Sequence, residues 1–507
     1  MAKEKIFIST AIPYVNAKPH IGHAFEMIQT DVLARYLRMA DNDVFFLTGS
    51  DENSLKNVLS AKKEGISTQE LVARNAKDFK DLAKALGASN KDFIRTTEDR
   101  HIRGAEKLWS ACKKDIYQKE YEGLYCVGCE DFYKEKDLTP EGLCPEHRTK
   151  PQVVKEKNYF FKLSNYQKQL HDLVTKDEIK IIPETRKHEV LKFIEAGLDD
   201  FSISRSVERA ENWGIKVPGD DSQIMYVWFD ALSNYITALG YADDDAKFKA
   251  YWQQGYSVHD IGKGILRFHA IYWPAMLLSA GVKPPNEVFV HGYLTVNGQK
   301  MSKSLGNVVD PMEMIQKYGA DALRYFLMSN ITPFEDGYFS EAKLKDSYSE
   351  LGNNLGNLVM RIAKIAQKDG LQKIKLPKEA SAVSSSGNLV IRYGAIKERY
   401  FEIFNDNRRL DEMLQHVWKF YIEANQLVDK DEPWKKNKEE KEIIISAQCF
   451  ALVYGAGLLT PFIPETSKKI FEMLGVKEPE TFADLEKIKE ITFDFDKIKP
   501  LFPRLEK

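Results

Sequence analysis

The sequence predicts an α/β protein whose parallel sheet is interrupted by an insertion and followed by a helical region. Up to about residue 110, strand-like runs such as KIFIST and DVFFLTG alternate with helical runs, which is typical of parallel α/β units. From about Tyr117 the chain is turn-rich and short-stranded, and it carries a cluster of cysteines. Strand and helix alternate again from residue 224, and after about residue 328 the pattern is almost wholly helical.

These changes of pattern divide the chain into five segments. The α/β pattern on either side of the insertion is of the same kind, so we expect the two flanking segments to form one domain. A short linking segment would then lead into the helical domain. The expected segments are 1–115 (first half of the α/β domain), 116–225 (insertion), 226–325 (second half), 326–350 (linking segment) and 351–507 (helical domain).

Length and composition limit the class of protein. A chain of 507 residues exceeds what one hydrophobic core usually organises, and 43% hydrophobic with 29% charged residues is ordinary for a globular protein. No apolar run reaches the roughly eighteen residues of a membrane span, and no signal-peptide pattern is found, so we expect a cytoplasmic protein without a membrane. The net charge of −2 indicates no overall preference for nucleic acid, so local basic patches would have to hold any polyanion.

The first motif follows the first strand, where AIPYVNAKPHIGH leads into a helix. Free backbone N–H groups and the helix dipole at a helix start favour an anion such as phosphate. Gly22 lets a ligand approach the backbone, and His20 and His23 add side-chain donors on one side of the turn. Two ordinary surface histidines at a helix cap would give the same short motif, so the motif alone leaves both interpretations open.

The second motif is HGYLTVNGQKMSKSLGN, a strand-like hairpin followed by a loop of lysines and small residues. Lys300 and Lys303 on such a loop can move as point charges onto transferring phosphates, although alone the loop would be taken for a solvated turn. Together with the first motif, it resembles the paired signatures of class I aminoacyl-tRNA synthetases. The resemblance implies a Rossmann-like catalytic domain in which His20, Gly22, His23 and Lys303 bind Mg-ATP, and in which the two histidines and two lysines act in catalysis.

Several stretches are similar to the methionyl-tRNA synthetase family, namely AIPYVNAKPHIGH, YVWFDALSNYIT, GILRFHAIYWPAMLL and the lysine motif. The similarity implies ATP-dependent ligation of L-methionine to tRNA(Met) through methionyl-adenylate. An ammonium group needs a carboxylate and a thioether needs a polarisable wall, whereas plain core packing is the alternative for each aromatic residue. The residues implied for the methionine site are Ile12, Tyr14, Asp51 (for the ammonium), Trp228, Tyr235, Ile265 and His269.

The insertion carries the pattern Cys126-x2-Cys129 followed by Cys144-x2-His147. Two close pairs separated by a loop supply the four ligands of a tetrahedral zinc site, and a site with four protein ligands is structural. The resemblance places one or two zinc knuckles in this insertion, and we find ligands for one. Free cysteines that share the spacing by coincidence are the alternative.

The helical region contains DEPWKKNKEE, in which Trp434 stands beside several lysines. An exposed aromatic residue next to lysines can stack a splayed base while the cations meet phosphates. The sequence alone favours a Trp packed inward, because large aromatic side chains are mostly buried. The family resemblance, which also covers NNLGNLVMR and assigns 326–350 to tRNA stem contact, instead makes Asn357, Arg361 and Trp434 the expected readers of the anticodon.

Two places depart from the family pattern. Asn53 and Ser54 stand where the family usually has histidine and glycine, and Gly264 stands where it usually has aspartate. An acidic side chain at 264 would meet the ribose hydroxyls of the adenylate, so its absence puts that contact and ATP affinity in doubt. A synthetase for leucine, isoleucine or valine is one alternative, although the chain leaves little room for their editing insertion. A non-enzymatic tRNA-binding relative is another. Because the chain ends soon after the helical region, we expect a monomer.

Overall fold

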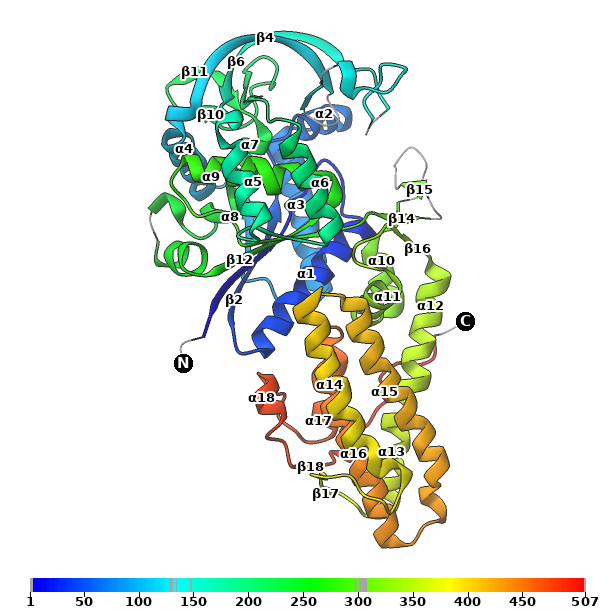
Figure 1. Ribbon diagram of the computed structural model, residues 1–507. Coiled ribbons are helices and arrows are strands. Elements are labelled where there is room, and N and C mark those ends of the chain that lie inside the picture. Colours follow the sequence, from blue (N-terminus) through cyan, green and yellow to red (C-terminus); the bar gives the residue numbers. More distant parts are fainter. Residues whose placement is uncertain are drawn as a thin grey trace.

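Figure 1 shows the computed structural model as an α/β region above an elongated helical region. The structure describes residues 3–126, 131–133, 135–145, 148–243, 245–296, 299–300 and 308–505. The C-terminal segment returns along the helical region to α12 (Glu341–Leu351), where the Tyr348 hydroxyl donates to the carbonyl of Pro503 at 2.6 Å.

The centre of the α/β region is a six-stranded sheet in which every neighbouring pair of strands is parallel. The strands are β1 (Lys5–Thr10), β2 (Asp43–Ser50), β3 (Asp92–Arg95), β7 (Lys180–Ile182), β12 (Tyr256–Gly262) and β13 (Glu287–His291). Their order is β3-β2-β1-β12-β13-β7, so the direction of winding reverses between β1 and β12. The predicted parallel α/β architecture with a Rossmann-like sheet is therefore confirmed.

Helices cover both faces of this sheet because strand side chains alternate between them. In β1, Ile6 and Ile8 pack into the core beneath α1 (Ile21–Met39), whereas Phe7 packs into a separate core on the other face. Helix α4 (Asp99–Ala111) belongs to the second core through Leu108. The remaining helices of this region are α2 (Leu55–Glu64), α3 (Thr68–Ala85), α5 (Gln167–Thr175), α6 (Glu184–Glu195), α7 (Val227–Leu232), α8 (Asn234–Thr237) and α9 (Trp273–Ser279).

The segment 116–225 is built mainly from short antiparallel strands. A long pair, β4 (Ile116–Cys126) and β6 (Gln152–Phe161), arches over the α/β region in Figure 1, and we call this pair the arm. The smaller strands are β5 (Asp131–Tyr133), β8 (Phe201–Ser202), β9 (Ser204–Ser206), β10 (Lys216–Val217) and β11 (Asp220–Met225). Strand β7 also lies within 116–225, and it pairs with β13 at the edge of the main sheet. The sheet therefore takes one strand from the range expected for the insertion.

The chain beyond residue 340 is mainly helical, as the sequence predicts. The apolar faces of these helices pack together and continue the core beneath α1. The helices beyond residue 340 are α12, α13 (Asn357–Lys368), α14 (Leu389–Asp406), α15 (Leu410–Asp431), α16 (Lys438–Leu459), α17 (Pro464–Met473) and α18 (Phe482–Leu485). Two further helices, α10 (Pro311–Tyr318) and α11 (Ala320–Asn330), precede them. A small strand pair, β17 (Lys373–Lys375) and β18 (Glu490–Thr492), also joins this region. In the linking segment, β16 (Gly337–Phe339) pairs with β14 (Leu294–Val296), which in turn pairs with β15 (Gln299–Lys300).

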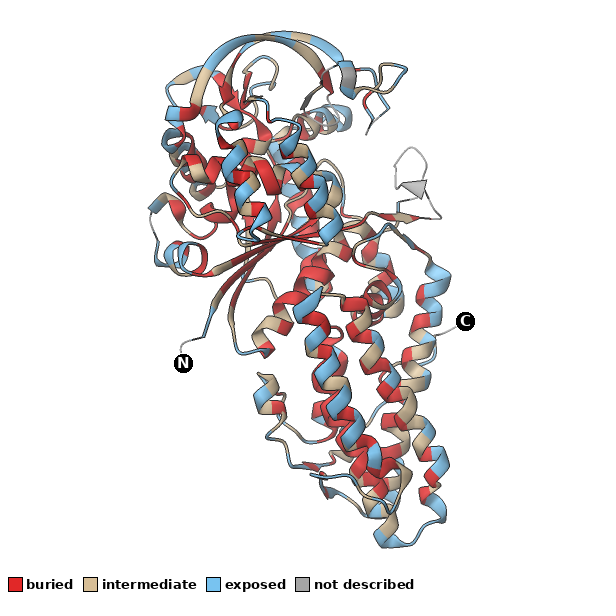
Figure 2. Ribbon diagram, in the orientation of Figure 1, coloured by how far each residue is buried: buried red, intermediate tan, exposed pale blue. Residues whose placement is uncertain are grey.

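The expectation that no apolar run reaches the length of a membrane span is wrong, because helix α16 is long and apolar enough, by length and composition, to cross a membrane. Of its most apolar stretch, 83% is buried inside the protein, as the red colouring of the helical region in Figure 2 illustrates. Its apolar residues therefore form the centre of the helical region.

Candidate active site

The candidate site lies at the carboxyl ends of β1 and β12, where the strand order reverses. In open parallel sheets, ligands bind in the crevice outside the carboxyl ends of the strands at this point. A cavity of about 220 Å³ opens there, and we call it the small cavity. Five of the residues predicted for the methionine site line it: Ile12, Tyr14, Asp51, Trp228 and Ile265.

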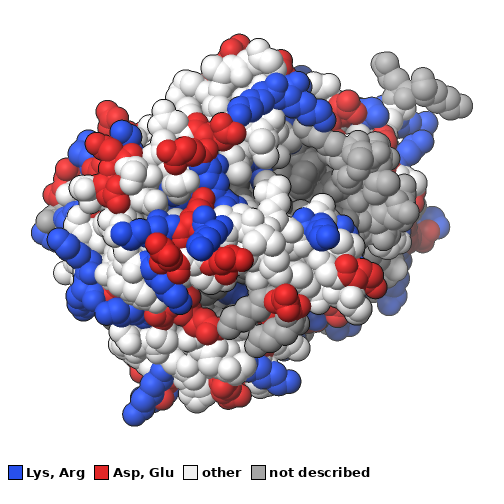
Figure 3. Space-filling view, turned by 90° about the horizontal axis from the view of Figure 1, so that it is seen from above, with Lys and Arg blue, Asp and Glu red and all other residues white. Residues whose placement is uncertain are grey.

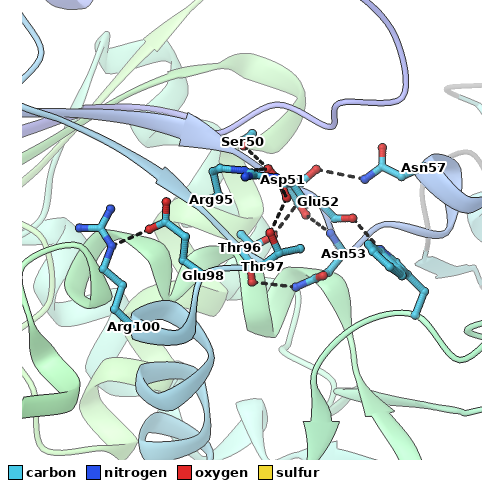
Figure 4. Close-up of polar contacts among 11 residues, drawn as sticks. Ser50, Asp51, Glu52, Asn53, Asn57, Arg95, Thr96, Thr97, Glu98 and Arg100 are labelled. Carbon is cyan, nitrogen blue, oxygen red and sulfur yellow. Dashed lines mark hydrogen bonds and ion pairs between the residues drawn. The ribbon is translucent and has the colours of Figure 1, made fainter. Parts of the chain in front are cut away.

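Two neighbouring carboxylates at the end of β2 have different surroundings (Figure 4). The carboxylate of Glu52 is fully buried and accepts from Arg95 Nε at 2.6 Å and Nη2 at 3.0 Å, as well as from hydroxyls of Ser50 and Thr97. Asp51 lines the small cavity, and its backbone is held by Asn57, whose amide donates to the Asp51 carbonyl at 3.2 Å. The charge of Glu52 is thus balanced by Arg95, and the Asp51 side chain, whose Oδ1 accepts from the Asn53 N–H at 3.3 Å, lines the cavity.

Asn53 and Ser54, which depart from the family pattern, hold the wall behind Asp51. The Asn53 side chain donates to Asp230 Oδ2 at 2.7 Å and to the Thr96 carbonyl at 3.1 Å. The Ser54 hydroxyl accepts from the backbone N–H of Lys56 and so caps the start of α2, as serine commonly does. Both residues therefore have structural roles that fit their side chains.

Tyr235 and His269 lie behind the small cavity and are almost fully buried. Neither of them is among the described residues that line this cavity. His269 Nδ1 lies 3.0 Å from the Ile265 carbonyl, which can only accept, so Nδ1 carries the proton. His269 Nε2 must then accept from the Tyr235 hydroxyl at 2.7 Å. Burial lowers the pKa of His269 to about 4, so both side chains are neutral. Their polar atoms form hydrogen bonds with each other and with the Ile265 carbonyl.

The two histidines of the first motif form the start of α1. His20 is its N-cap: its Nδ1 accepts from the Gly22 N–H at 3.1 Å, while His23 Nδ1 accepts from the His20 N–H at 3.1 Å. The rings are stacked with centroids 3.8 Å apart. Burial lowers the pKa of His20 to about 4 and that of His23 well below its ordinary value. Both rings are therefore neutral near pH 7 with the proton on Nε2, which leaves two adjacent N–H donors for an anion.

Glu26 and His291 are site residues that the sequence analysis did not identify. Glu26 Oε1 accepts from the Ala11 N–H at 2.9 Å, and its Oε2 lies 3.0 Å from His291 Nε2. Burial would lower the pKa of His291, but the hydrogen bond and charge of Glu26 outweigh it and raise that pKa to about 9. The pair ties the end of β13 to the loop after β1. The position of Glu26 three residues after His23, on the same side of α1, is a signal that could have found it.

Gly264 is closely approached by Tyr293, since a Cβ atom at Gly264 would lie 1.8 Å from the Tyr293 hydroxyl oxygen. Tyr293 is held there by Asp336, which accepts from its backbone N–H at 2.8 Å and pairs with Lys263 at 2.7 Å. The space that a larger side chain at 264 would need is therefore occupied by a phenol. This arrangement differs from the family pattern described above and explains why glycine fits here.

A larger cavity of about 1380 Å³, which we call the large cavity, adjoins the small one. Tyr14, His23, Trp228 and Ile265 line both, and the large cavity also reaches His20, Gly22 and Gly264. Of the predicted catalytic lysines, Lys300 contributes backbone to β15 opposite Thr295. Its side chain and the whole of Lys303 lie outside the described residues.

Two of the four predicted zinc ligands, Cys126 and Cys144, are described, and both are buried. Both contact Thr149: Cys126 Sγ lies 3.9 Å from its hydroxyl, and the Cys144 N–H donates to its carbonyl at 2.9 Å. Cys129 and His147 lie outside the described residues. Within the part of the chain that the structure describes, no group of three His, Cys, Asp or Glu residues could hold a metal.

The three predicted anticodon residues lie in the helical region. Asn357 is the first residue of α13 and is exposed, and Arg361 lies one turn later and pairs with Asp429 near the end of α15. Trp434 lies in the short 3-10 turn after α15 and is 51% exposed. The inward-packed interpretation of Trp434 is therefore wrong, and its ring is available to a partner.

Comparison with known proteins identifies relatives over the whole chain. The family described as "tRNA synthetases class I (M)" matches residues 6–152 and 146–363. Methionine–tRNA ligase of Brucella suis biovar 1 (strain 1330) is 40% identical over 517 residues, covering 99% of this chain and 98% of that protein. The structure of Mycobacterium tuberculosis methionyl-tRNA synthetase in complex with methionyl-adenylate has a TM-score of 0.92 and 36% identity, covering 99% of this chain and 100% of that one. Its apo form has a TM-score of 0.85 and 33% identity, covering 100% and 99%.

The parallel sheet, with a pair of histidines at the helix start beside its switch point, together with this family match, defines a class I aminoacyl-tRNA synthetase. The similarity to relatives specific for one amino acid extends over almost the whole chain. The chain belongs to the methionyl-tRNA synthetase family.

Proposed function

We propose that this chain ligates L-methionine to tRNA(Met) in two steps. A carboxylate oxygen of methionine attacks the α-phosphorus of Mg-ATP, and pyrophosphate leaves. The 3′-terminal hydroxyl of the tRNA then attacks the carbonyl carbon of methionyl-adenylate, and AMP leaves. Full-length similarity to methionine–tRNA ligases supports this proposal, as does the similarity to a relative solved with methionyl-adenylate.

The observation that carries the proposal is that His23 lines both cavities. A small cavity with a carboxylate and aromatic walls suits a zwitterionic amino acid with a thioether, and the large cavity beside it suits a nucleotide. The carboxylate of a bound amino acid and the α-phosphate of ATP would then meet at the start of α1. Catalysis of this kind needs positioning and electrostatic stabilisation rather than a covalent enzyme intermediate.

On the amino-acid side, we assign the ammonium group to Asp51 and the thioether to the wall formed by Ile12, Tyr14, Trp228 and Ile265. The neutral Tyr235–His269 pair would close the end of the pocket behind this wall. Its donor atoms are already engaged with each other and with Ile265, so it offers little to a polar side chain of similar size. A pocket of this kind would select for an apolar, polarisable side chain.

On the nucleotide side, we assign the phosphates to the Nε2–H groups of His20 and His23, together with the backbone at Gly22. Because the imidazoles are neutral in the free enzyme, they act as hydrogen-bond donors that require no prior proton uptake. Lys300 and Lys303 would neutralise the charge of the departing pyrophosphate, and the magnesium ion that accompanies ATP would share that task.

Four further assignments belong to the same proposal. One structural zinc ion would be held by Cys126, Cys129, Cys144 and His147, and the burial of the two described cysteines around Thr149 supports it. Asn357, Arg361 and Trp434 would read the anticodon. The five-segment division of the chain would hold with one change, since strand β7 of 116–225 belongs to the main sheet, and 326–350 would contact the tRNA stem. A cytoplasmic monomer is proposed, and the mass of the protein in solution would test its oligomeric state.

The experiment that tests the proposed function is ATP–pyrophosphate exchange with a panel of amino acids. We expect exchange with methionine far above that with leucine, isoleucine or valine. Exchange with one of those three instead would assign the chain to a related specificity. No exchange with any amino acid, by a protein that still binds tRNA(Met), would indicate a non-enzymatic tRNA-binding protein.

A further inference from the structure

A buried chain of hydrogen bonds joins three elements behind the small cavity. Asp230 of α7 is fully buried and uses both carboxylate oxygens: Oδ1 lies 2.6 Å from His101 Nε2 of α4, and Oδ2 accepts from Asn53 Nδ2 at 2.7 Å. Because a carboxylate can only accept, His101 Nε2 carries a proton. We call His101, Asp230 and Asn53 the clamp.

Further contacts fix the two ends of the clamp. His101 Nδ1 lies 2.9 Å from the Thr237 hydroxyl of α8, and a Cβ atom at Gly104 would lie 2.2 Å from Thr237 Cγ2, so α4 and α8 are in close contact. At the other end, the Asn53 amide also donates to the Thr96 carbonyl at 3.1 Å, as Figure 4 shows. The clamp therefore cannot shift without breaking contacts in α4, in α8 and in the loop after β3.

Asn53 joins the clamp to the carboxylate that we assign to the ammonium group. Its backbone N–H donates to Asp51 Oδ1 at 3.3 Å, while its side chain donates to Asp230. The Asp51 backbone is held separately, since its N–H donates to the Pro13 carbonyl at 2.9 Å. The orientation of the Asp51 carboxylate therefore depends in part on the position of Asn53, and that position depends on Asp230.

Asp230 joins the clamp to the wall that we assign to the thioether. Trp228 and Asp230 are two residues apart in α7, so they point to roughly opposite sides of the helix. Trp228 lines the small cavity and stacks on Phe268, with ring centroids 3.8 Å apart. Phe229 packs against Trp109 of α4, with ring centroids 5.1 Å apart. Contacts of Phe229 and Asp230 with α4 therefore keep Trp228 turned toward the cavity.

The chemistry of methionine makes the relative position of these two contacts important. Its ammonium group and its thioether lie at opposite ends of a flexible chain, and a pocket that holds both contacts in place beforehand lowers the cost of binding. Over the face seen in Figure 3, cationic and anionic side chains are interspersed, so recognition of an ammonium group comes from a particular carboxylate rather than from a uniformly acidic face. The position of that carboxylate then decides the affinity.

We propose that the clamp positions Asp51 and Trp228 relative to each other, and so sets the spacing between the ammonium site and the thioether wall. Its three members are positioning residues, because none of them is among the described residues that line the small cavity. This inference rests on the proposed function and extends it by naming the residues that fit the pocket to methionine. It also gives a role to Asn53, whose amide supplies the donor that the link to Asp230 needs.

The experiment compares Asn53→Ala, Asp230→Ala and Asp230→Asn with Asn42→Ala. Asn42 is a matched control because it lies just before β2, is partly buried as Asn53 is, and donates its side-chain amide to the Leu37 carbonyl at 3.0 Å. Each protein is titrated with methionine and with desamino-methionine, which keeps the thioether and the carboxylate but lacks the ammonium group. Methionine-dependent ATP–pyrophosphate exchange and the melting temperature are measured on the same preparations.

We expect the wild type to bind methionine about 10- to 100-fold more tightly than desamino-methionine, because the analogue lacks a charged hydrogen-bond donor. Asn53→Ala should lose most of that difference by weakening methionine alone, and its exchange rate at saturating methionine should change far less than its affinity. Asp230→Ala should weaken both ligands, because Trp228 is released as well. Asp230→Asn should bind nearly as the wild type does, since an amide at 230 can accept from Asn53 and donate to His101. Asn42→Ala should match the wild type throughout.

The proposal is overturned if Asn53→Ala weakens both ligands equally or keeps the full difference between them. It is also overturned if Asp230→Asn binds as weakly as Asp230→Ala, because hydrogen bonds would then not position the pocket. If Asp230→Ala melts early, Asn53→Ala decides, because a partly buried amide can be removed with little loss of packing. Failure of wild-type exchange with methionine would instead reject the proposed function, so the two failures are distinguishable.

Discussion

Arg324 of α11 lies with its guanidinium 2.8 Å from the carboxylate of Asp31 in α1, and both side chains are fully buried. Arg324 Nε and Nη2 also donate to the carbonyls of Phe462 and Pro461 at the turn between α16 and α17. Burial would raise the pKa of Asp31, but Arg324 and Arg35 outweigh it and lower that pKa to about 2. One side chain therefore joins the helix that begins with His20 to the centre of the helical region.

Arg324→Met should destabilise the protein strongly. Removing one partner of a buried ion pair leaves the other charge uncompensated, which typically costs about 3–5 kcal/mol of unfolding free energy. Arg35 remains beside Asp31, so the lower end of that range is expected. Denaturant unfolding would measure the effect, with Lys477→Met as a control because the Lys477–Glu480 pair is exposed. A loss no greater than that of the control would mean that the buried pair does not join the two regions.

The sequence could predict the part of the site that follows from strand order. Ile12, Tyr14, Asp51 and His20 come just after β1 or β2, and the ends of neighbouring parallel strands meet at one edge of a sheet. Strand β7 could not be predicted as part of that sheet, because three residues carry no periodicity and its partner lies more than a hundred residues away. The contact between α1 and α11 through Asp31 and Arg324 also depends on tertiary structure, so the sequence could not predict it.

Burial was the other property that the sequence could not supply. An aromatic residue at a helix end is consistent with either a core or a surface, and only the structure places Trp434 at 51% exposure. In the same way, Tyr235 and His269 belong to the methionine-site prediction, but packing places them behind the cavity rather than in its lining among the described residues. The sequence shows that Gly264 departs from the family pattern, but it does not show why. The structure supplies the reason, because Tyr293 lies too close to Gly264 for a larger side chain.

His20→Asn should separate the folding role of His20 from its proposed chemical role. Asparagine is a good N-cap and can accept from the Gly22 N–H as Nδ1 does, but it has no donor at the position of Nε2. The melting temperature should therefore stay near that of the wild type, whereas the exchange rate should fall by ~10²–10³. Exchange at the wild-type rate in this variant would exclude His20 from phosphate stabilisation.

The rate of ATP–pyrophosphate exchange should not change near pH 6.5 through titration of His20. Burial lowers the pKa of His20 in the free enzyme to about 4, so its ring is already neutral at pH 6 and above. The unfolded chain binds more protons than the folded chain between about pH 4 and 6.5, so this group lowers stability as the pH falls through that window. The pH profile of kcat/KM for ATP, measured for the wild type and His20→Asn, should have the same shape above pH 5.5. A step near pH 6.5 that only the wild type has would contradict this prediction.

Metal analysis of the purified protein should find one zinc per chain. Cys144→Ser should lose that zinc and loosen the segment around Thr149, because structural zinc contributes folding free energy. Methionine-dependent exchange should persist, since Cys144 does not line either cavity among the described residues. Cys449→Ser is the matched control, because Cys449 is buried in α16, far along the chain from the predicted ligands. A wild-type protein that is fully active without zinc would rule the site out.

Trp434→Ala should impair charging of tRNA(Met) while leaving ATP–pyrophosphate exchange unchanged. The ring is half exposed in the turn between α15 and α16, and Arg361 pairs with Asp429 in the last turn of α15. Exchange needs only methionine and ATP, whose proposed sites lie at the carboxyl ends of the sheet strands. Loss of one stacked base typically costs ~1–3 kcal/mol, which should appear in the apparent affinity for the tRNA.

Two further measurements make the Trp434 prediction decisive. Because the side chain is exposed, the melting temperature of Trp434→Ala should stay close to that of the wild type, whereas a Trp that holds the helices together would lower it and reduce both activities. Ile391→Ala provides a matched control, since Ile391 is another exposed apolar residue of the helical region, with 63% exposure, and has no assigned partner role. A tRNA(Met) with a changed anticodon should bind wild type and Trp434→Ala about equally. If exchange falls in step with charging, or if the changed anticodon still distinguishes the two proteins, Trp434 does not read the anticodon.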